Sequence, residues 1–146
     1  MSEWIADLYV NGHPRPQGSM SYVGKGRMVH SPRLMEWRKT IFAAIDEWIS
    51  FYGDAWEPIT GPVEVDMKFY LPKARSNRDA HPTNTRSGDC DKLIRAANDA
   101  ISLGETRLIA DDAQVLRIRG EKFWALGMPG EDGHVPGMRL RVRPHE

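Results

Sequence analysis

Four aspartates flank one predicted helix of this chain and are its residues best suited to chemistry. Asp89 and Asp91 stand at the start of the helix predicted over residues 91–103, and Asp111 and Asp112 follow its end. Carboxylate oxygens are the ligands that Mg²⁺ and Mn²⁺ prefer. Carboxylates converging within ~4 Å repel one another by about 4 kcal/mol per pair at an effective dielectric constant near 20, and a bound cation relieves that repulsion. The pattern favours a divalent-metal site if the two pairs meet in space.

The helix itself predicts which way these side chains point. At 100° per residue, one face is apolar and is expected to be buried. The members of that face are Leu93, Ala97, Ala100 and Ile101. Asp91 lies on the opposite, polar face with Arg95 one turn further on, and Asp89 precedes them in an extended or capping conformation. If residues 87–91 are extended, Asp89 and Asp91 point the same way.

The second aspartate pair directly precedes a strand predicted over residues 114–125. A helix, a short loop and a strand can fold back so that the strand passes the N-terminus of the helix. That arrangement would bring Asp112 or Asp111 beside Asp89 and Asp91. The alternative is purely structural: Asp89 caps the helix, Asp91 interacts with the helix dipole, and the second pair forms a turn.

The remaining elements must position these residues. Alternating or apolar runs predict strands over residues 4–10, 63–71, 114–125 and 138–143 and a short hairpin at 20–30. A long helix is predicted over residues 32–52, with Ser31 as its cap and Pro32 at its first position. Its apolar stripe comprises Leu34, Trp37, Ile41, Ile45, Trp48 and Tyr52. We expect an α+β fold, a single domain over residues 1–146 with a mixed sheet and two main helices packed on one face.

Composition excludes several classes of protein. The chain carries 20 Lys and Arg against 20 Asp and Glu, so its net charge says nothing about a nucleic-acid partner. Its one cysteine, Cys90, excludes an internal disulfide. No Cys/His spacing suggests zinc, no Gly-rich phosphate loop suggests an organic cofactor, and no apolar run reaches the ~20 residues that span a membrane. We expect a soluble, cytoplasmic protein without a membrane partner.

Basic residues concentrate in three places. The polar loop before the aspartates carries Lys73, Arg75, Arg78 and Arg86, and Lys92 follows Asp91. A basic loop beside an acidic metal site suits DNA, because the loop attracts the phosphates that the metal then receives. Two further clusters, Arg139, Arg141 and Arg143 and then Arg117, Arg119 and Lys122, fit either a solvated sheet face or contacts to a DNA backbone.

The segments "GDCDKLIRAANDAI" and "IADDAQV" together resemble the signature of the RusA family of Holliday junction resolvases. The order of the other elements is also similar, with "PRPQGS" near the N-terminus, then a long helix, then the strand "PVEVDMKFYLP". The resemblance spans most of the chain. It implies a small homodimeric endonuclease, of phage or prophage type, that cuts four-way DNA junctions with Mg²⁺, or with Mn²⁺ as a substitute.

The resemblance also implies roles for individual residues. Asp89, Asp91 and Asp112 match the metal-binding aspartates, and Asp111 matches a supporting neighbour. Arg95 takes the place of a lysine important for catalysis, and Lys92 takes the place of an asparagine. Arg95 keeps the positive charge but donates a proton less readily than lysine does.

We therefore expect a metal-dependent, structure-selective DNA endonuclease that resolves branched DNA in recombination and repair. It would work in a bacterial cytoplasm, or in the host cytoplasm if a phage encodes it. The alternative is a non-catalytic DNA-binding or phage assembly protein on the same scaffold. The two differ in the use of the aspartates, because carboxylates on a surface that only binds DNA weaken its binding.

Overall fold

The structure is a computed structural model that describes residues 3–18, 21–22, 28–29, 31–102 and 106–146. The main helices are α1 (Pro32–Ser50) and α2 (Cys90–Ser102). The strands are β1 (Ala6–Asn11), β2 (Ser21–Tyr22), β3 (Met28–Val29), β4 (Val63–Leu71), β5 (Val115–Trp124) and β6 (Gly137–Pro144). Short 3₁₀ helices lie in the connections: η1 (Gly53–Ala55), η2 (Thr85–Ser87) and η3 (Asp112–Gln114).

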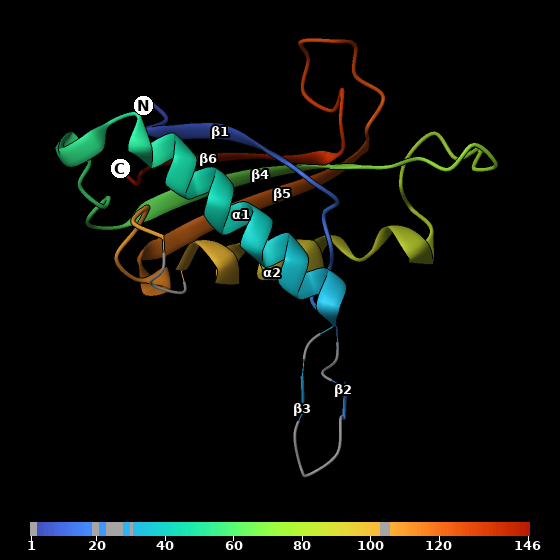
Figure 1. The fold of residues 1–146 in the computed structure, drawn as a ribbon, viewed down its shortest axis with the longest axis horizontal. Coiled ribbons are helices and arrows are strands. Elements are labelled where there is room, and N and C mark those ends of the chain that lie inside the picture. The colour runs from blue at the N-terminus through green and yellow to red at the C-terminus, as the bar shows by residue number, and fades with distance from the viewer. Residues whose placement is uncertain (1–2, 19–20, 23–27, 30, 103–105) are drawn as a thin grey trace.

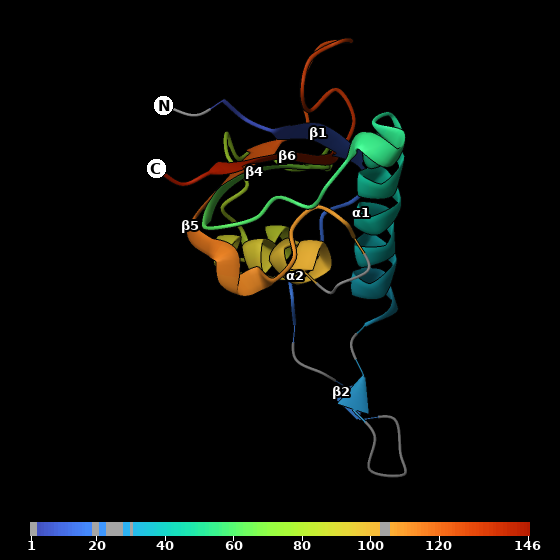
Figure 2. The same ribbon diagram turned by 90° about the vertical axis from the view of Figure 1, so that its left-hand side faces the viewer.

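The main sheet is mixed. Within the described residues its strand order is β1-β6-β4-β5, and β2 and β3 form a separate antiparallel pair. β6 is antiparallel to both β1 and β4, whereas β4 and β5 are parallel. Both main helices lie on one side of this sheet (Figures 1 and 2). The expected α+β fold is confirmed.

The connection from β4 through α2 to β5 is a crossover between neighbouring parallel strands. A helix in such a connection runs antiparallel to both strands, because the chain must return to the edge of the sheet from which it started. The contacts agree with this direction. Ile94 in the first half of α2 packs over Gly120 in the second half of β5. The N-terminus of α2 therefore lies near the carboxyl ends of β4 and β5.

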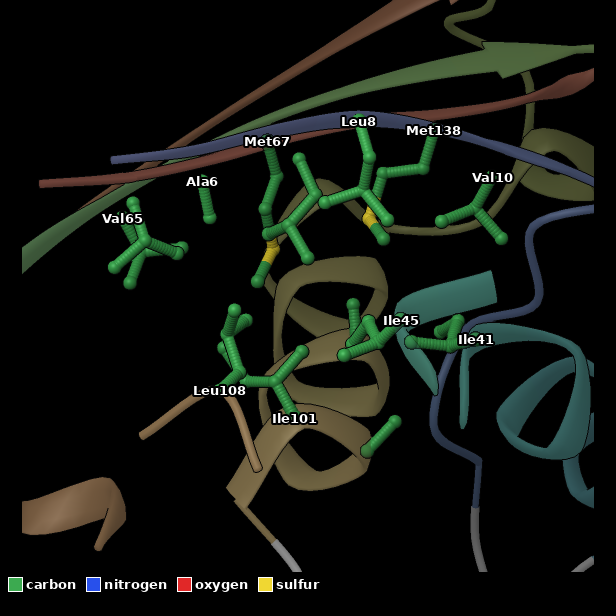
Figure 3. Packing of buried hydrophobic residues seen from close by; sticks show 14 of the residues in the cluster. Ala6, Leu8, Val10, Ile41, Ile45, Val65, Met67, Ile101, Leu108 and Met138 are labelled. Carbon is green, nitrogen blue, oxygen red and sulfur yellow. The ribbon is translucent and has the colours of Figure 1, made fainter. Parts of the chain in front are cut away.

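The alternation of apolar and polar residues in β4 explains how the sheet packs against the helices. Its apolar residues, each at most 2% exposed, are Val63, Val65, Met67, Phe69 and Leu71. Figure 3 shows side chains of the sheet, among them Val65, Met67 and Met138, pointing toward Ile101 and Ile45 on the helices. The predicted buried face of α2 is confirmed, since all four of its residues are fully buried.

α1 begins and ends for local reasons. The Ser31 hydroxyl accepts a hydrogen bond from the Leu34 backbone N–H at 3.2 Å, and Pro32 occupies the first turn, as expected. The predicted stripe is buried from Leu34 to Ile45. Tyr52 is 47% exposed because the helix ends at Ser50, two residues earlier than predicted.

The other face of the sheet carries ion pairs in place of a helix. Arg141 pairs with Asp66 at 2.7 Å, and Arg143 and Arg117 both pair with Glu64, at 3.6 and 3.1 Å. Trp4 lies against the guanidinium groups of Arg141 and Arg143. Each of these arginines is paired with a carboxylate within the face, which favours a solvated face over a DNA contact for this part of the molecule.

Two other expectations concern a hairpin and a membrane-spanning segment. β2 and β3 lie within the hairpin expected at residues 20–30, and the rest of that segment is outside the described residues. Across the residues that the structure describes, no helix has the length and apolar character needed to cross a membrane.

Gly120 allows α2 to lie close to β5, and this yields a first prediction. A Cβ at this position would lie 2.4 Å from the Ile94 side chain. Gly120→Ala should therefore lower the free energy of unfolding by about 1–3 kcal/mol, as overpacked cores do. Chemical denaturation measures the change.

The matched control is Gly18→Ala, since nothing lies within 4 Å of a Cβ there. Shortening the opposing side chain with Ile94→Ala should recover part of the loss in the double variant. Equal stability of the wild type and Gly120→Ala would contradict the close contact.

Candidate functional site

The first aspartate pair lies where α2 begins, near the carboxyl ends of β4 and β5. The Asp89 carbonyl accepts the first helical hydrogen bond from Leu93 N–H at 3.0 Å, so Asp89 precedes the helix in the position of a cap. Asp91 lies in the first turn, and both carboxylates are exposed. An extended segment over 87–91 was wrong, because η2 ends at Ser87 and the helix already begins at Cys90.

Lys122 of β5 holds the turn that leads into α2. Its ammonium group donates to the Gly88 carbonyl at 2.8 Å and to the Ser87 hydroxyl at 3.0 Å. Lys122 is therefore engaged within the fold. The thiol of Cys90 is half-buried beside it, and this burial raises its pKa. These contacts fix the direction in which the helix starts, and with it the position of the first aspartate pair.

The second aspartate pair belongs to η3. The Asp111 carboxylate accepts from Ala113 N–H at 2.8 Å, and the Gln114 side chain accepts from Asp111 N–H at 2.7 Å, which closes a capping box. The Ala113 hydrogen bond lowers the pKa of Asp111, and the hydrogen bond between the two carboxyl groups raises that of Asp112. Both side chains remain exposed.

The structure does not bring the two pairs together within one chain. η3 precedes β5 and contacts α2, whereas the first pair stands at the helix start (Figure 1). The 13 residues of α2 separate its ends by about 18 Å at 1.5 Å per residue. The expected fold-back was wrong because the crossover places the end of β5, not its start, beside the N-terminus of α2.

Within the part of the chain that the structure describes, the two aspartate pairs do not form a metal site together. Over residues 3–18, 21–22, 28–29, 31–102 and 106–146, no three Asp, Glu, His or Cys side chains gather closely enough to hold an ion. Asp89 and Asp91, two residues apart at the start of α2, both have exposed carboxylates, and carboxylate oxygens are ligands that Mg²⁺ prefers.

The basic residues expected to bind DNA lie on the loop that leads from β4 to α2 and in the first turns of α2. Arg75, Arg78 and Arg86 are exposed on the loop between β4 and α2. Lys92 forms an exposed ion pair with Asp89 at 3.4 Å. Lys73 places its ammonium group 5.9 Å from the centre of the Trp124 ring. Arg95 is exposed one turn after Asp91, on the polar face, as predicted.

Next to this pair is a pocket of about 410 Å³ that the sequence did not reveal. It lies between the segment 13–16 and the loop that follows β4, with Trp124 and Leu71 among its lining residues. The sequence could have indicated this pocket, because Leu71 and Trp124 are the last residues of two strands, β4 and β5, which the structure shows to be parallel.

The segment 13–16 is held in place by its neighbours. Gln17 N–H donates to the Lys92 carbonyl at 3.0 Å, and the buried Arg38 side chain of α1 bridges Gln17 and Asp99. Pro16 lies close to Gly88, where a Cβ would approach it to 3.0 Å. The "PRPQGS" segment thus forms a wall of the site.

A family model described as endodeoxyribonuclease RusA matches residues 11–130 of this chain. The matched region contains both aspartate pairs, the residues that line the pocket, and the basic loop between β4 and α2. No curated protein matches the chain.

A second prediction concerns the turn before α2. Lys122→Met keeps most of the apolar stem and removes both hydrogen bonds, so we expect the free energy of unfolding to fall by about 1–3 kcal/mol. Amide hydrogen exchange should accelerate most over residues 88–93. Lys68→Met is the control, because Lys68 lies in β4 on a different face. Unchanged exchange at the turn would show that Lys122 does not hold it.

Proposed function

This chain belongs to the RusA family of endodeoxyribonucleases, and from that membership we propose that it is a metal-dependent enzyme that resolves four-way junctions and other branched DNA by paired cuts. Recombination and repair are the processes that supply such DNA. The observation that carries the proposal is the exposed pair Asp89 and Asp91 near the carboxyl ends of the parallel strands, directly after a loop with exposed arginines.

The loop and the carboxylates have complementary tasks. Arg75, Arg78 and Arg86 would neutralise phosphates of the approaching DNA. This contribution to the binding affinity does not depend on base sequence and weakens as the salt concentration rises. Lys92, paired with Asp89, would exchange that partner for a phosphate as the metal takes its place. Arg95 would offset charge that develops on the phosphate during cleavage. Mg²⁺, or Mn²⁺ in its place, would supply an activated water and stabilise the leaving oxygen.

The separation of the aspartates leads us to place the metal site between two chains. Asp112 cannot reach Asp89 and Asp91 across the length of α2 in one subunit. A two-fold dimer can place Asp112, with Asp111 as its hydrogen-bonded neighbour, beside the first pair of its partner, and the symmetry then creates two identical sites. Two sites related in this way match the two cuts that resolve a junction.

The alternative function is a non-catalytic DNA-binding or phage assembly protein on the same scaffold. Carboxylates exposed among basic residues weaken the binding of a phosphate backbone unless a cation joins them. Their exposure directly after the basic loop, and beside Lys92, favours the enzyme. The two proposals separate when a divalent metal is added to a labelled four-way junction, since only the enzyme releases nicked products.

A third prediction tests the role of the first aspartate pair. Asp89→Asn should lower cleavage of a four-way junction at least 100-fold while leaving junction binding equal or tighter, because it removes a ligand charge without adding bulk. Cleavage and gel-shift assays on one preparation measure both. Asp54→Asn, on the exposed η1, serves as the matched control. Cutting at the wild-type rate by Asp89→Asn would refute the assignment.

A fourth prediction tests the shared site. Asp89→Asn and Asp112→Asn chains carrying different tags are co-expressed, and the mixed dimers are isolated through both tags. Each parent dimer should be inactive, whereas a mixed dimer contains one site with both substitutions and one intact site. The mixed dimer should therefore cut one strand of the junction without making the paired second cut.

A completely inactive mixed dimer would contradict the shared site. If each site lies within one chain, both sites of the mixed dimer carry a substitution and it will be as inactive as its parents. Light scattering supplies the assembly state, with an expected mass about twice the 16.6 kDa of one chain.

A further inference from the structure

The pocket beside Asp89 stands at the edge of the sheet where ligands commonly bind. Leu71 and Trp124, the last residues of the parallel strands β4 and β5, form part of its lining. Crevices outside the carboxyl ends of parallel strands are the usual binding positions in sheets crossed by helices. Its volume of about 410 Å³ lies within the range of ~300–1,000 Å³ for small-molecule pockets.

The lining combines flat apolar groups with positive charge. Pro14, Pro16 and Pro72 join Trp124 as apolar walls, and Arg15 and Arg86 supply guanidinium groups. Asp and Glu are absent from the residues that the structure places around this pocket. Burial, with help from the nearby Arg15, lowers the pKa of His13. Such a lining suits a flat aromatic group attached to an anion.

The walls are already fixed without a ligand. The indole N–H of Trp124 donates to the Asp79 carbonyl at 3.0 Å, which sets the orientation of the ring. Asn84 accepts from Ser87 N–H at 3.0 Å and holds η2 in place. Arg38 fixes the segment 13–16 through Gln17. A preformed pocket loses little conformational entropy on binding.

We propose that this pocket holds one unpaired nucleotide of the DNA strand being cut, with its base against Trp124 and the prolines and its phosphate between Arg15 and Arg86. The proposal rests on the proposed function and adds to it the feature of DNA that the enzyme selects. A base pair stacked in a duplex cannot enter the pocket, whereas a nucleotide that has left the stack can. Unstacking costs least where pairing is already interrupted, as at a branch point.

Binding to junctions with one base removed tests the proposal without cleavage. All proteins carry Asp89→Asn so that the DNA stays intact, and an abasic site replaces each nucleotide near the branch in turn. At one position the missing base should weaken binding about tenfold, which is the value of one stacked base. Trp124→Leu, which keeps an apolar side chain but no ring, should weaken binding of the complete junction to the same extent.

The double change decides the question. With Trp124→Leu the abasic site should have no further effect, and with Trp124→Phe, which keeps a ring, the abasic site should again weaken binding. Trp4→Ala is the control, because Trp4 stacks on arginines of the opposite sheet face and should leave the abasic effect unchanged. Additive losses from Trp124→Leu and the abasic site, or no sensitive position at all, would overturn the pocket's assignment.

Failure of this proposal is distinguishable from failure of the proposed function. Cleavage of the complete junction by the wild-type enzyme, with additive losses in the binding cycle, would leave the endonuclease intact and remove only the nucleotide pocket. Coupling in the binding cycle, with no cleavage by the wild-type protein under any divalent metal, would leave a selective binder of branched DNA.

Discussion

The direction of α2 is the constraint on which the rest of the site depends. Because β4 and β5 are parallel neighbours, the helix between them must run back across the sheet. Gly120 permits the close approach of Ile94, and Lys122 fixes the turn from which the helix starts. Asp89, Asp91 and the pocket are thereby collected at one end of the sheet, and the second aspartate pair is left at the other.

Much of the fold could be predicted from local patterns. Alternation gave β4 with its observed bounds, and the spacing of apolar residues gave both helices and the buried face of α2. The parallel pairing of β4 and β5 could not be obtained in this way, because side-chain alternation describes faces and says nothing about the direction of the neighbouring strand. The helix between two strands was the available signal, and its use would have corrected the expected position of Asp112.

Charge explains why a chain with equal numbers of acidic and basic groups can still present a surface for DNA. On the open face of the sheet the arginines are paired, as Arg141 is with Asp66 and Arg139 with Asp7. The loop before α2 is different, since Arg75, Arg78 and Arg86 are exposed there. Net charge averages over both regions. Whether a region suits DNA therefore depends on where its charges lie on the fold and whether they are paired.

The two proposals about the site, a shared metal centre and a nucleotide pocket, restrict the substrate in different ways. A centre shared between subunits makes cutting depend on assembly, so an isolated chain bound to DNA would be inert. A pocket that admits only an unstacked nucleotide makes cutting depend on the shape of the DNA, so a duplex held by the basic loop would place no nucleotide in it. Together they require two subunits and an interrupted helix at once. On these proposals the basic loop would bind any DNA through its phosphates without damage to ordinary duplex, because affinity would reside in the loop and selectivity in the pocket.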